Sequence, residues 1–445
     1  MDQTEPEPSQ GLVFSDRVTV NGDYTPLTLS DDGVIRWPEG AQRCLNVEKE
    51  VLGFATDGLK IKIRTLVESG DGIACFGSRG ALVRKTFAFH FSSQDSQSLF
   101  CLKLRECIDS LGRPKRLFVL VNPFGGQKLA SKILLDQVKP LLNDADIQFT
   151  LQETQYQLHA KEVAKTMDLS KYDGIVCVSG DGILVEVVNG LLEREDWETA
   201  IKTPLGVVPA GTGNGMAKSL LDFVGEPCTA SNSVLAIIRG HKRSLDVSTI
   251  LQGETKFFSV LMLAWGLIAD IDIESEKYRW MGSARLDFYA LLRVLCLRKY
   301  NGRVSFVPAP GFEAYGKPRN DKSEATDKQN ISGSSGVKPV KFSDGYIDLI
   351  ITRDCPKLPL LSLMTEMNNG NHVNSPYVMY LKVKAFILEP GPQAENPTKE
   401  GIIDSDGEVL ARGKGTYKCD QKTLMAYDKI QLTVDQGLAT LFSPL

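Results

Sequence analysis

The stretch VCVSGDGILVEVVNGLL, Val176 to Leu192, runs from an apolar segment through Ser179-Gly180-Asp181-Gly182 into a second apolar segment with helical periodicity. The first segment is typical of a buried strand, and the segment after Ile183 is typical of a helix. A strand, a short loop and a helix in this order begin a βαβ unit. The feature that needs a chemical explanation is the single carboxylate between two glycines at the end of the strand.

The same alternation extends from Arg113 to about Gly240. Strands are predicted at RLFVLV, IQFTL, GIVCV and LGVV, and helix-compatible segments separate them. Strands separated by helices of this length pair in parallel, so we expect an α/β doubly wound domain. In such sheets, ligands bind at the carboxyl ends of the strands.

Three of these strand ends carry glycine-rich loops: Asn122-Pro123-Phe124-Gly125-Gly126, Ser179-Gly180-Asp181-Gly182 and Pro209-Ala210-Gly211-Thr212-Gly213-Asn214. One such loop is usually only a tight turn, but three loops on one sheet edge predict a phosphate site. Backbone N–H groups and helix N-termini bind anionic oxygens there, and Ser179 and Thr212 add hydroxyl donors. The loops are neither a Walker A nor a Rossmann fingerprint, and no protein-kinase motif set is present.

Asp181 is predicted to lie beside the terminal phosphate of a nucleotide, where a carboxylate can accept the proton of an attacking hydroxyl. The alternative is that Asp181 caps the helix that begins near Ile183. Glu186, one turn later, is either an exposed helix residue or a carboxylate that supports Asp181 or Mg²⁺.

Composition limits the class of protein. A length of 445 residues predicts two or three domains, and a formal net charge of −4 argues against a nucleic-acid partner. Nine cysteines without CxxC pairs and four histidines without metal spacing predict reduced thiols and no metal site in the protein. The start MDQTEPEPSQ is no signal peptide, and the longest apolar run is too short to span a bilayer. We therefore expect a cytoplasmic protein.

Two further parts flank the α/β domain of residues 113–240. Residues 1–112 read as short strands closed by one amphipathic helix, a β-rich module similar to a pleckstrin-homology (PH) domain. Residues 241–445 are rich in short strands and predict an antiparallel β-sandwich. The apolar segment LPLLSLMTEMNNGNH interrupts that pattern, and residues 315–340 form a polar stretch that reads as a disordered loop.

Three motifs carry a family resemblance: VNPFGG, VSGDGILVEVVNGL and PAGTGN resemble the catalytic domain shared by diacylglycerol, ceramide and sphingosine kinases. LMLAWGLIADIDIESEKYRWMGSAR, Leu261 to Arg285, is similar to the sphingosine (long-chain base) kinases, of the plant type. The resemblance implies transfer of the ATP γ-phosphate, with Mg²⁺, to the primary hydroxyl of a sphingoid base. It also implies a peripheral membrane surface as a partner, and homo-oligomers are possible.

The resemblance assigns roles to individual residues. Asp181 is the base, held with Ser179 and Gly180. The nucleotide is expected to meet Asn122, Pro123, Phe124, Thr154, Glu186, Gly211, Thr212, Gly213, Arg279, Arg285, Asp406, Gly407 and Glu408. The lipid is expected to meet Asp272 with its head group and Leu363, Met364, Met367 and His372 with its tail. A leucine and methionine stripe is otherwise typical of plain core, and His372 of a core histidine.

The residues around Asp272 support the head-group assignment independently. Asp270, Asp272 and Glu274 recur at every second position after an apolar segment, which predicts the end of a strand. We expect Asp272 to pair with the cationic amine and the other two acids to be solvated. Arg279 and Arg285 follow closely and fit as guanidinium clamps on phosphate.

One departure keeps alternatives open. Family members place an apolar strand shortly before FSDGYIDL, whereas this chain has the polar residues 315–340 there. A missing strand would deform the lipid pocket, so a catalytically weak lipid-binding protein is the second hypothesis. Kinase action on diacylglycerol, ceramide or a nicotinamide dinucleotide is a third, and the segment around Asp272 disfavours it.

Overall fold

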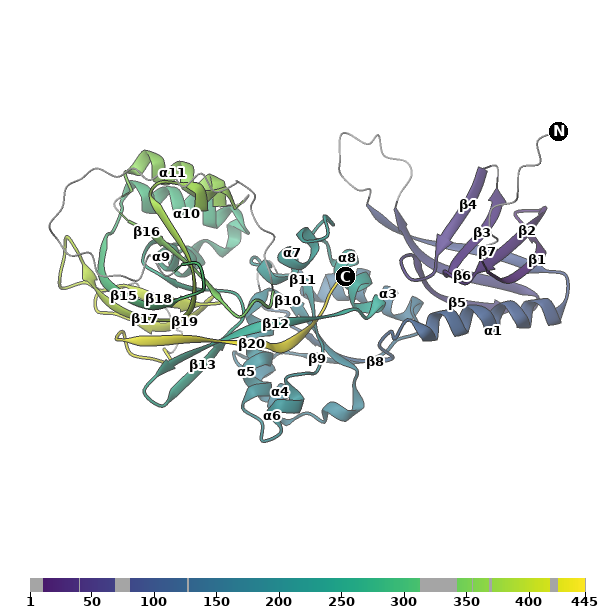
Figure 1. The fold of residues 1–445 in the computed structure, drawn as a ribbon, viewed down its shortest axis with the longest axis horizontal. Helices are drawn as coiled ribbons and strands as arrows, with labels where there is room; N and C mark the ends of the chain where they lie inside the picture. Colours follow the sequence, from purple (N-terminus) through teal and green to yellow (C-terminus); the bar gives the residue numbers. More distant parts are fainter. Residues whose placement is uncertain are drawn as a thin grey trace.

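The computed structural model describes residues 11–39, 41–68, 81–125, 128–312, 342–353, 355–367, 370–416 and 423–444. Figure 1 shows a β-rich module at one end of the molecule, an α/β part in the middle and a β-sandwich at the other end. The polar stretch 315–340, and the strand predicted to be missing there, lie outside the described residues.

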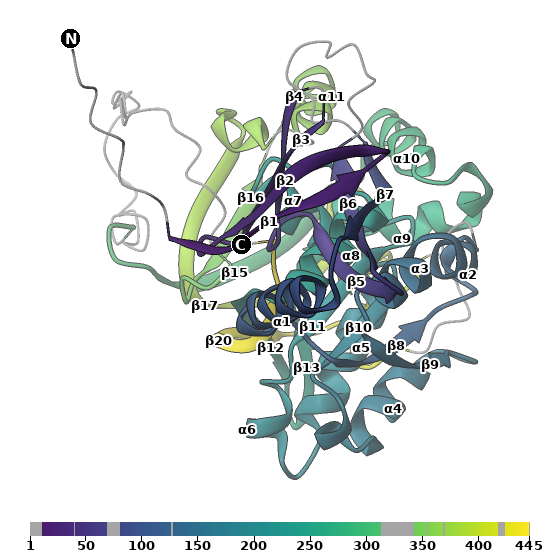
Figure 2. The ribbon, with the colours of Figure 1, turned by 90° about the vertical axis from the view of Figure 1, so that its right-hand side faces the viewer.

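The N-terminal module is one antiparallel sheet closed by a helix (Figure 2). Alternating burial, as in KIKIRTLV of β6, places Ile61 and Ile63 in the core on one face of the sheet. Helix α1 (Gln94–Ser110), capped by Ser93, packs Phe100 and Leu104 on that core. The sheet order is β4-β3-β2-β1-β7-β6-β5, from β1 (Leu12–Val20), β2 (Asp23–Ser30), β3 (Val34–Glu39), β4 (Ala41–Asn46), β5 (Val51–Asp57), β6 (Lys60–Glu68) and β7 (Leu82–Phe91).

These elements agree with the predicted strands followed by one helix. The likeness of the module to a PH domain stays a prediction.

The middle part has the predicted alternation of strands and helices. Its parallel strands β8 (Arg116–Val121), β9 (Gln148–Glu153), β10 (Gly174–Ser179) and β11 (Leu205–Pro209) lie in the order β11-β10-β8-β9. Apolar cores cover both faces of the sheet, which explains the continuous apolar sequence of β10. The helical segments are α2 (Ala130–Ile133), η1 (Leu134–Val138), α3 (Lys139–Asp144), α4 (His159–Thr166), η2 (Leu169–Lys171), α5 (Asp181–Leu192), α6 (Trp197–Ala200), α7 (Gly215–Asp222) and α8 (Ala230–Arg239).

The predicted β-sandwich is present, and one of its sheets is continuous with the α/β sheet. Strand β20 (Ile430–Phe442) pairs in parallel with β11 and antiparallel with β12 (Lys242–Gln252) and β17 (Val378–Gln393). The predicted boundary at residue 240 therefore falls, along the chain, between β11 and β12, which are strands of the same sheet. This sheet also holds β13 (Thr255–Ser259), β15 (Tyr300–Pro308) and β16 (Ile347–Thr352).

The second sheet of the sandwich is small. It consists of β14 (Leu263–Trp265), β18 (Ile402–Ser405) and β19 (Glu408–Arg412), in the order β14-β18-β19. Ile403 and Leu410 of this sheet share one core with Phe386 and Leu432 of the large sheet. Helical segments α9 (Leu267–Glu274), η3 (Ser275–Met281), α10 (Ala284–Leu295), α11 (Lys357–Glu366) and η6 (Asn371–Asn374) lie at this end of the molecule.

Two local predictions are wrong. The apolar segment before Asp270, Asp272 and Glu274 is two short strands, β13 and β14, separated by residues 260–262, and not one strand that continues into the acids. The acidic segment after it is the helix α9 and not a strand end. Residues four apart share a helix face, so Asp270 and Glu274 point together and Asp272 points elsewhere.

Candidate active site

The three glycine-rich loops meet at one edge of the parallel sheet. The Ala210 N–H donates to the Ser179 carbonyl at 3.0 Å, which joins the ends of β10 and β11. A Cβ on Gly211 would lie 2.3 Å from the Gly180 Cα, so this contact between backbones requires glycine. A Cβ on Gly125 would lie 3.7 Å from the Ser179 hydroxyl, which brings the Asn122 loop to the same edge.

Asp181 lies at the centre of this edge, and its side chain caps a neighbouring helix. Its two carboxylate oxygens accept hydrogen bonds from the N–H groups of Gly215, at 2.7 Å, and Met216, at 3.0 Å. These are the first residues of α7, whereas Gly180 is the N-cap residue of α5. The alternative that Asp181 caps its own helix is therefore wrong. Burial raises the pKa of the Asp181 carboxyl, and the two backbone hydrogen bonds oppose this shift.

Glu186 is a buried carboxylate, so of the two alternatives for this residue the exposed helix residue is wrong. It accepts a hydrogen bond from the Ala160 N–H at 3.0 Å and thereby holds the N-terminus of α4. Glu408 lies close enough to Glu186 for the two charges to interact, and it accepts a hydrogen bond from the Gln157 amide at 3.0 Å. Burial, together with the charge of Glu186, raises the pKa of Glu408 to about 7.

The other residues assigned to the nucleotide lie around the same edge. The Asn122 side chain accepts the Phe124 N–H at 3.0 Å and shapes the first loop, with Pro123 between them and the Phe124 ring exposed. Thr154 is buried at the end of β9, where its N–H donates to the Val121 carbonyl at 2.8 Å. In the third loop, which contains Thr212, the Asn214 side chain bonds both backbone polar groups of Gly211. Their contacts with ATP stay predictions.

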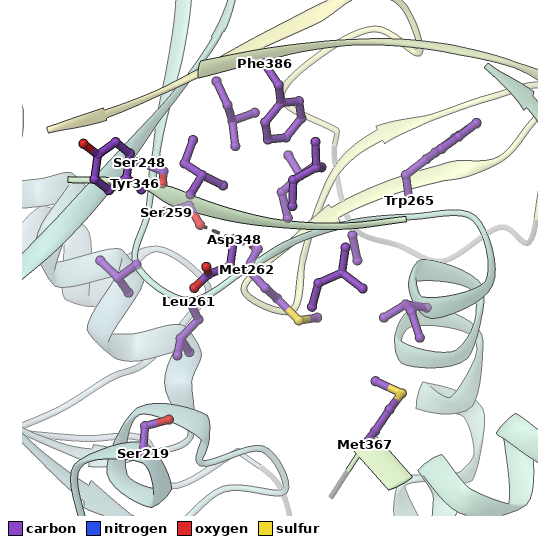
Figure 3. Close-up of a pocket in the computed structure, with 18 of the residues that line it drawn as sticks. Ser219, Ser248, Ser259, Leu261, Met262, Trp265, Tyr346, Asp348, Met367 and Phe386 are labelled. Carbon is purple, nitrogen blue, oxygen red and sulfur yellow. Dashed lines mark hydrogen bonds between the residues drawn. The ribbon is translucent and has the colours of Figure 1, made fainter. Parts of the chain in front are cut away.

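A largely apolar cavity of about 550 Å³ opens beside this edge (Figure 3). This volume lies in the usual range for small-molecule sites. Figure 3 shows Leu261 and Met262 on the turn between β13 and β14, and Met367 at the end of α11. Leu363, Met364, Met367 and His372 all line the cavity, as expected of residues that contact a lipid tail. Nδ1 of His372 is buried and meets no hydrogen-bond partner in the described part of the chain.

The cavity reaches Asp181 through two residues that the sequence did not single out as site residues. Met216 lines the cavity with its side chain, while its N–H donates to Asp181. Leu261 also lines it, and a Cβ on Gly215 would contact both Leu261 and the Asp181 carboxylate, at 3.6 and 3.5 Å. The carboxylate therefore lies next to two residues of the cavity wall, beside the glycine loops.

Asp406 holds the turn that forms one wall of the cavity. Its carboxylate accepts hydrogen bonds from the N–H groups of Val260, Leu261 and Met262 at 3.1, 2.9 and 2.8 Å. Asp406 and Gly407 both have a positive φ, 55° and 82°, in the turn that leads to Glu408. Burial raises the pKa of Asp406 to about 6. These contacts make Asp406 a positioning residue, and its contact with ATP stays a prediction.

The expectation that Asp270 and Glu274 are solvated is wrong. Both are buried, and Arg298 bonds both carboxylates, at 3.3 Å to Asp270 and 2.7 Å to Glu274. Asp270 also accepts the Tyr300 hydroxyl at 2.7 Å, and Glu274 accepts the Tyr289 hydroxyl at 2.5 Å. This buried network anchors one face of α9 and fixes the helix that carries Asp272.

Asp272 lies on another face of α9, close enough to Arg285 and Asp181 for their charges to act on its carboxyl group. Arg285 donates to the Ser275 hydroxyl at 2.6 Å and pairs with Glu276 at 3.1 Å. Arg279 also pairs with Glu276, so the structure brings the two predicted arginines to one carboxylate. Burial raises the pKa of Asp272, whereas the charge of Arg285 lowers it, and Asp181 is near enough to add to the rise.

The described residues hold no cluster of three or more His, Cys, Asp or Glu side chains suited to a metal ion. None of the helices in the described ranges has both the length and the apolar character that crossing a bilayer requires.

Comparison with known proteins is consistent with this arrangement. Residues 116–250 match the family described as diacylglycerol kinase catalytic domain, and residues 333–426 match the YegS C-terminal NAD kinase beta sandwich-like domain. The chain is 58% identical to Sphingosine kinase 1 of Arabidopsis thaliana over 97% of this chain and 96% of the relative. It is 58% identical to Sphingosine kinase 2 of the same plant over 98% and 97% of the two chains. It is 35% identical to Sphingosine kinase 1 of Homo sapiens over 67% of this chain and 87% of the relative.

Proposed function

This chain belongs to the sphingosine kinase family, and we propose that it transfers the γ-phosphate of ATP to the primary hydroxyl of a sphingoid long-chain base. One observation carries the proposal. The Asp181 carboxylate lies where three glycine-rich loops meet the wall of an apolar cavity. A lipid hydroxyl and a phosphate can meet at such a point, with the lipid chain in the cavity.

In the proposed reaction, Asp181 accepts the proton of the lipid hydroxyl as its oxygen attacks the γ-phosphorus. The bond from that phosphorus to the β,γ-bridging oxygen breaks, and ADP leaves. The raised pKa of Asp181 supports this role because it makes the carboxylate a better proton acceptor. Its two bonds to the N-terminus of α7 hold it in one orientation.

The glycine loops are proposed to bind the ATP phosphates with backbone N–H groups. Mg²⁺ in kinases is held mainly by phosphate oxygens with one or two carboxylates, so we treat it as part of the MgATP substrate. Arg279 and Arg285 both pair with Glu276, and they are proposed to exchange this carboxylate for phosphate oxygens when the nucleotide binds. Glu186 and Glu408, which are close enough for their charges to interact, are also proposed to lie at the nucleotide.

The lipid is proposed to enter with its tail in the cavity and its ammonium group against Asp272. Each buried CH₂ contributes about 0.8 kcal/mol, so a long tail supplies most of the binding free energy. The ammonium group supplies the specificity, because a charged hydrogen bond to a carboxylate is stronger than a neutral one.

A membrane surface is the proposed source of the lipid. Trp280 is 81% exposed and Leu358 is 82% exposed, which is unusual for large apolar side chains. The Lys357 ammonium donates to the Leu295 carbonyl, so the start of α11, with Leu358, lies beside the exposed end of α10. Leu361 and Met367, also exposed, continue this apolar surface along α11 toward the cavity. We infer peripheral membrane association through this surface.

The test is phosphate transfer by the purified chain from γ-labelled ATP to sphingosine, dihydrosphingosine and phytosphingosine. We expect a labelled product from at least one base, with mass spectrometry placing the phosphate on the primary hydroxyl. No transfer to any base by folded protein that still binds ATP would overturn the proposal and favour a lipid-binding role.

A further inference from the structure

A second carboxyl group lies behind Asp272. Asp404 is on β18, the central strand of the small sheet, where it pairs with Ala264 of β14. It is a charged residue type, yet it is fully buried, at 0% exposure, like the apolar residues Ile402 and Ile403 that precede it on the strand. Helix α9 packs against β18, and the carboxyl groups of Asp272 and Asp404 lie within hydrogen-bonding reach of each other.

No donor in the described part of the chain satisfies Asp404. Neither of its side-chain oxygens has a hydrogen-bond partner that could supply a proton, because the group that it faces is another acid. A buried carboxylate without a donor or a cation is strongly destabilised. A neutral carboxylic acid removes this cost, because its O–H can donate to the Asp272 carboxylate.

The charges around the pair favour the same arrangement. Burial raises the pKa of Asp404 well above its ordinary value, and the carboxylates of Asp272, Asp406 and Glu408 raise it further. Asp272 faces Arg285 as well, and both this guanidinium and the hydrogen bond from Asp404 lower its pKa against the effect of burial. Glu276 and Asp181 are the other charged groups that act on Asp272. These influences favour the proton of the pair on Asp404 and the charge on Asp272.

We propose that Asp404 is a positioning residue for head-group recognition, whose carboxylic acid donates a hydrogen bond to Asp272 and keeps that carboxylate ionised and directed toward the sphingoid ammonium. The inference rests on the proposed function, since it concerns how that function selects its substrate. With Asp404 neutral, the pair carries one negative charge and matches one ammonium group. Two ionised carboxylates would instead leave one charge buried without a partner after the lipid binds.

The test compares two substitutions whose side chains branch like that of aspartate and have the same number of heavy atoms. Asp404→Asn can still donate a hydrogen bond to Asp272, whereas Asp404→Leu cannot. We expect Asp404→Asn to keep a KM for sphingosine close to that of the wild type. We expect Asp404→Leu to raise this KM by about tenfold, the scale of one hydrogen bond to a charged group, with KM for ATP unchanged.

The pH profile gives a readout that a purely structural role would not move. Without the donor, the pKa of Asp272 rises, so the acidic limb of kcat/KM for sphingosine should shift to higher pH in Asp404→Leu and stay in place in Asp404→Asn. Thermal unfolding verifies that each variant is folded, and Asp404→Ala replaces the leucine variant if that protein does not fold.

The outcomes separate the two claims. An inactive wild type would refute the proposed function itself. If the wild type is active and the Leu or Ala variant has the wild-type KM for sphingosine and the wild-type pH profile, only the role of Asp404 is refuted. An Asn variant as impaired as the Leu variant would also refute it, because Asp404 would then have to be ionised.

Discussion

Replacing Asp181 with asparagine should separate its two roles, as a proton acceptor and as the cap of α7. The carboxylate accepts from Gly215 and Met216. An amide can accept only one of these bonds, and its NH₂ group then faces a backbone donor. We therefore expect a loss of about 1–3 kcal/mol in the free energy of unfolding. Loss of the base should lower kcat for sphingosine by about 10²–10⁴-fold.

The matched control is Ser93→Ala, which removes the side-chain cap of α1 in the N-terminal module. It should cost about 1 kcal/mol of stability and leave kcat unchanged. Urea unfolding gives the stabilities, and initial rates at saturating sphingosine and labelled ATP give kcat. If folded Asp181→Asn protein turns over within about tenfold of the wild type, Asp181 is only a helix cap and another group accepts the proton.

Three further substitutions test the nucleotide loop, the head-group contact and the membrane surface. Gly213→Val should fold normally, because a Cβ there meets only the Asp181 carboxylate at 3.6 Å, yet calorimetry should show weaker ATP binding; unchanged binding would mean that the loop is only a turn. Asp272→Asn should raise KM for sphingosine by about tenfold or more and leave KM for ATP unchanged; a loss of ATP affinity instead would contradict the head-group assignment. Leu358→Glu should reduce sedimentation of the protein with lipid vesicles, while its rate on detergent-solubilised sphingosine stays at the wild-type value; equal sedimentation would exclude this surface.

The α/β part of the fold was predictable because its signals are local. Each strand is buried on both faces, so its sequence is continuously apolar, and each glycine loop follows directly along the chain. Parallel pairing then brings the three loops to one edge without any further information. The position of Asp181 at this edge followed from the same reasoning.

The segment around Asp272 was not predictable from its own pattern. Acids alternate with Ile271 and Ile273, which is the pattern of a strand, but Asp270 and Glu274 are also four apart and share a helix face. Their burial depends on Arg298 and Tyr300, which follow the next helix, α10, in the sequence. The local pattern is therefore compatible with a strand and with a helix, and ion pairs with residues distant in sequence favour the helix.

The capping contacts and Asp404 were missed for a related reason. Asp181 caps a helix 34 residues away in sequence, and Asp406 holds a turn 144 to 146 residues away. One signal for Asp404 was present: an acid in the middle of GIIDSDGEVL, a segment that otherwise reads as a buried strand. A buried charge in such a place is costly, so the sequence alone marks Asp404 as a candidate functional residue.

Selection of a lipid with a free amine can be tested with a matched pair of substrates. Sphingosine and N-acetylsphingosine share the diol and the long tail, but only sphingosine carries an ammonium group for Asp272. We predict that kcat/KM of the wild-type chain is higher for sphingosine by about tenfold or more, the scale of one charged hydrogen bond. Equal values, or a preference for N-acetylsphingosine, would show that the site does not recognise a free amine.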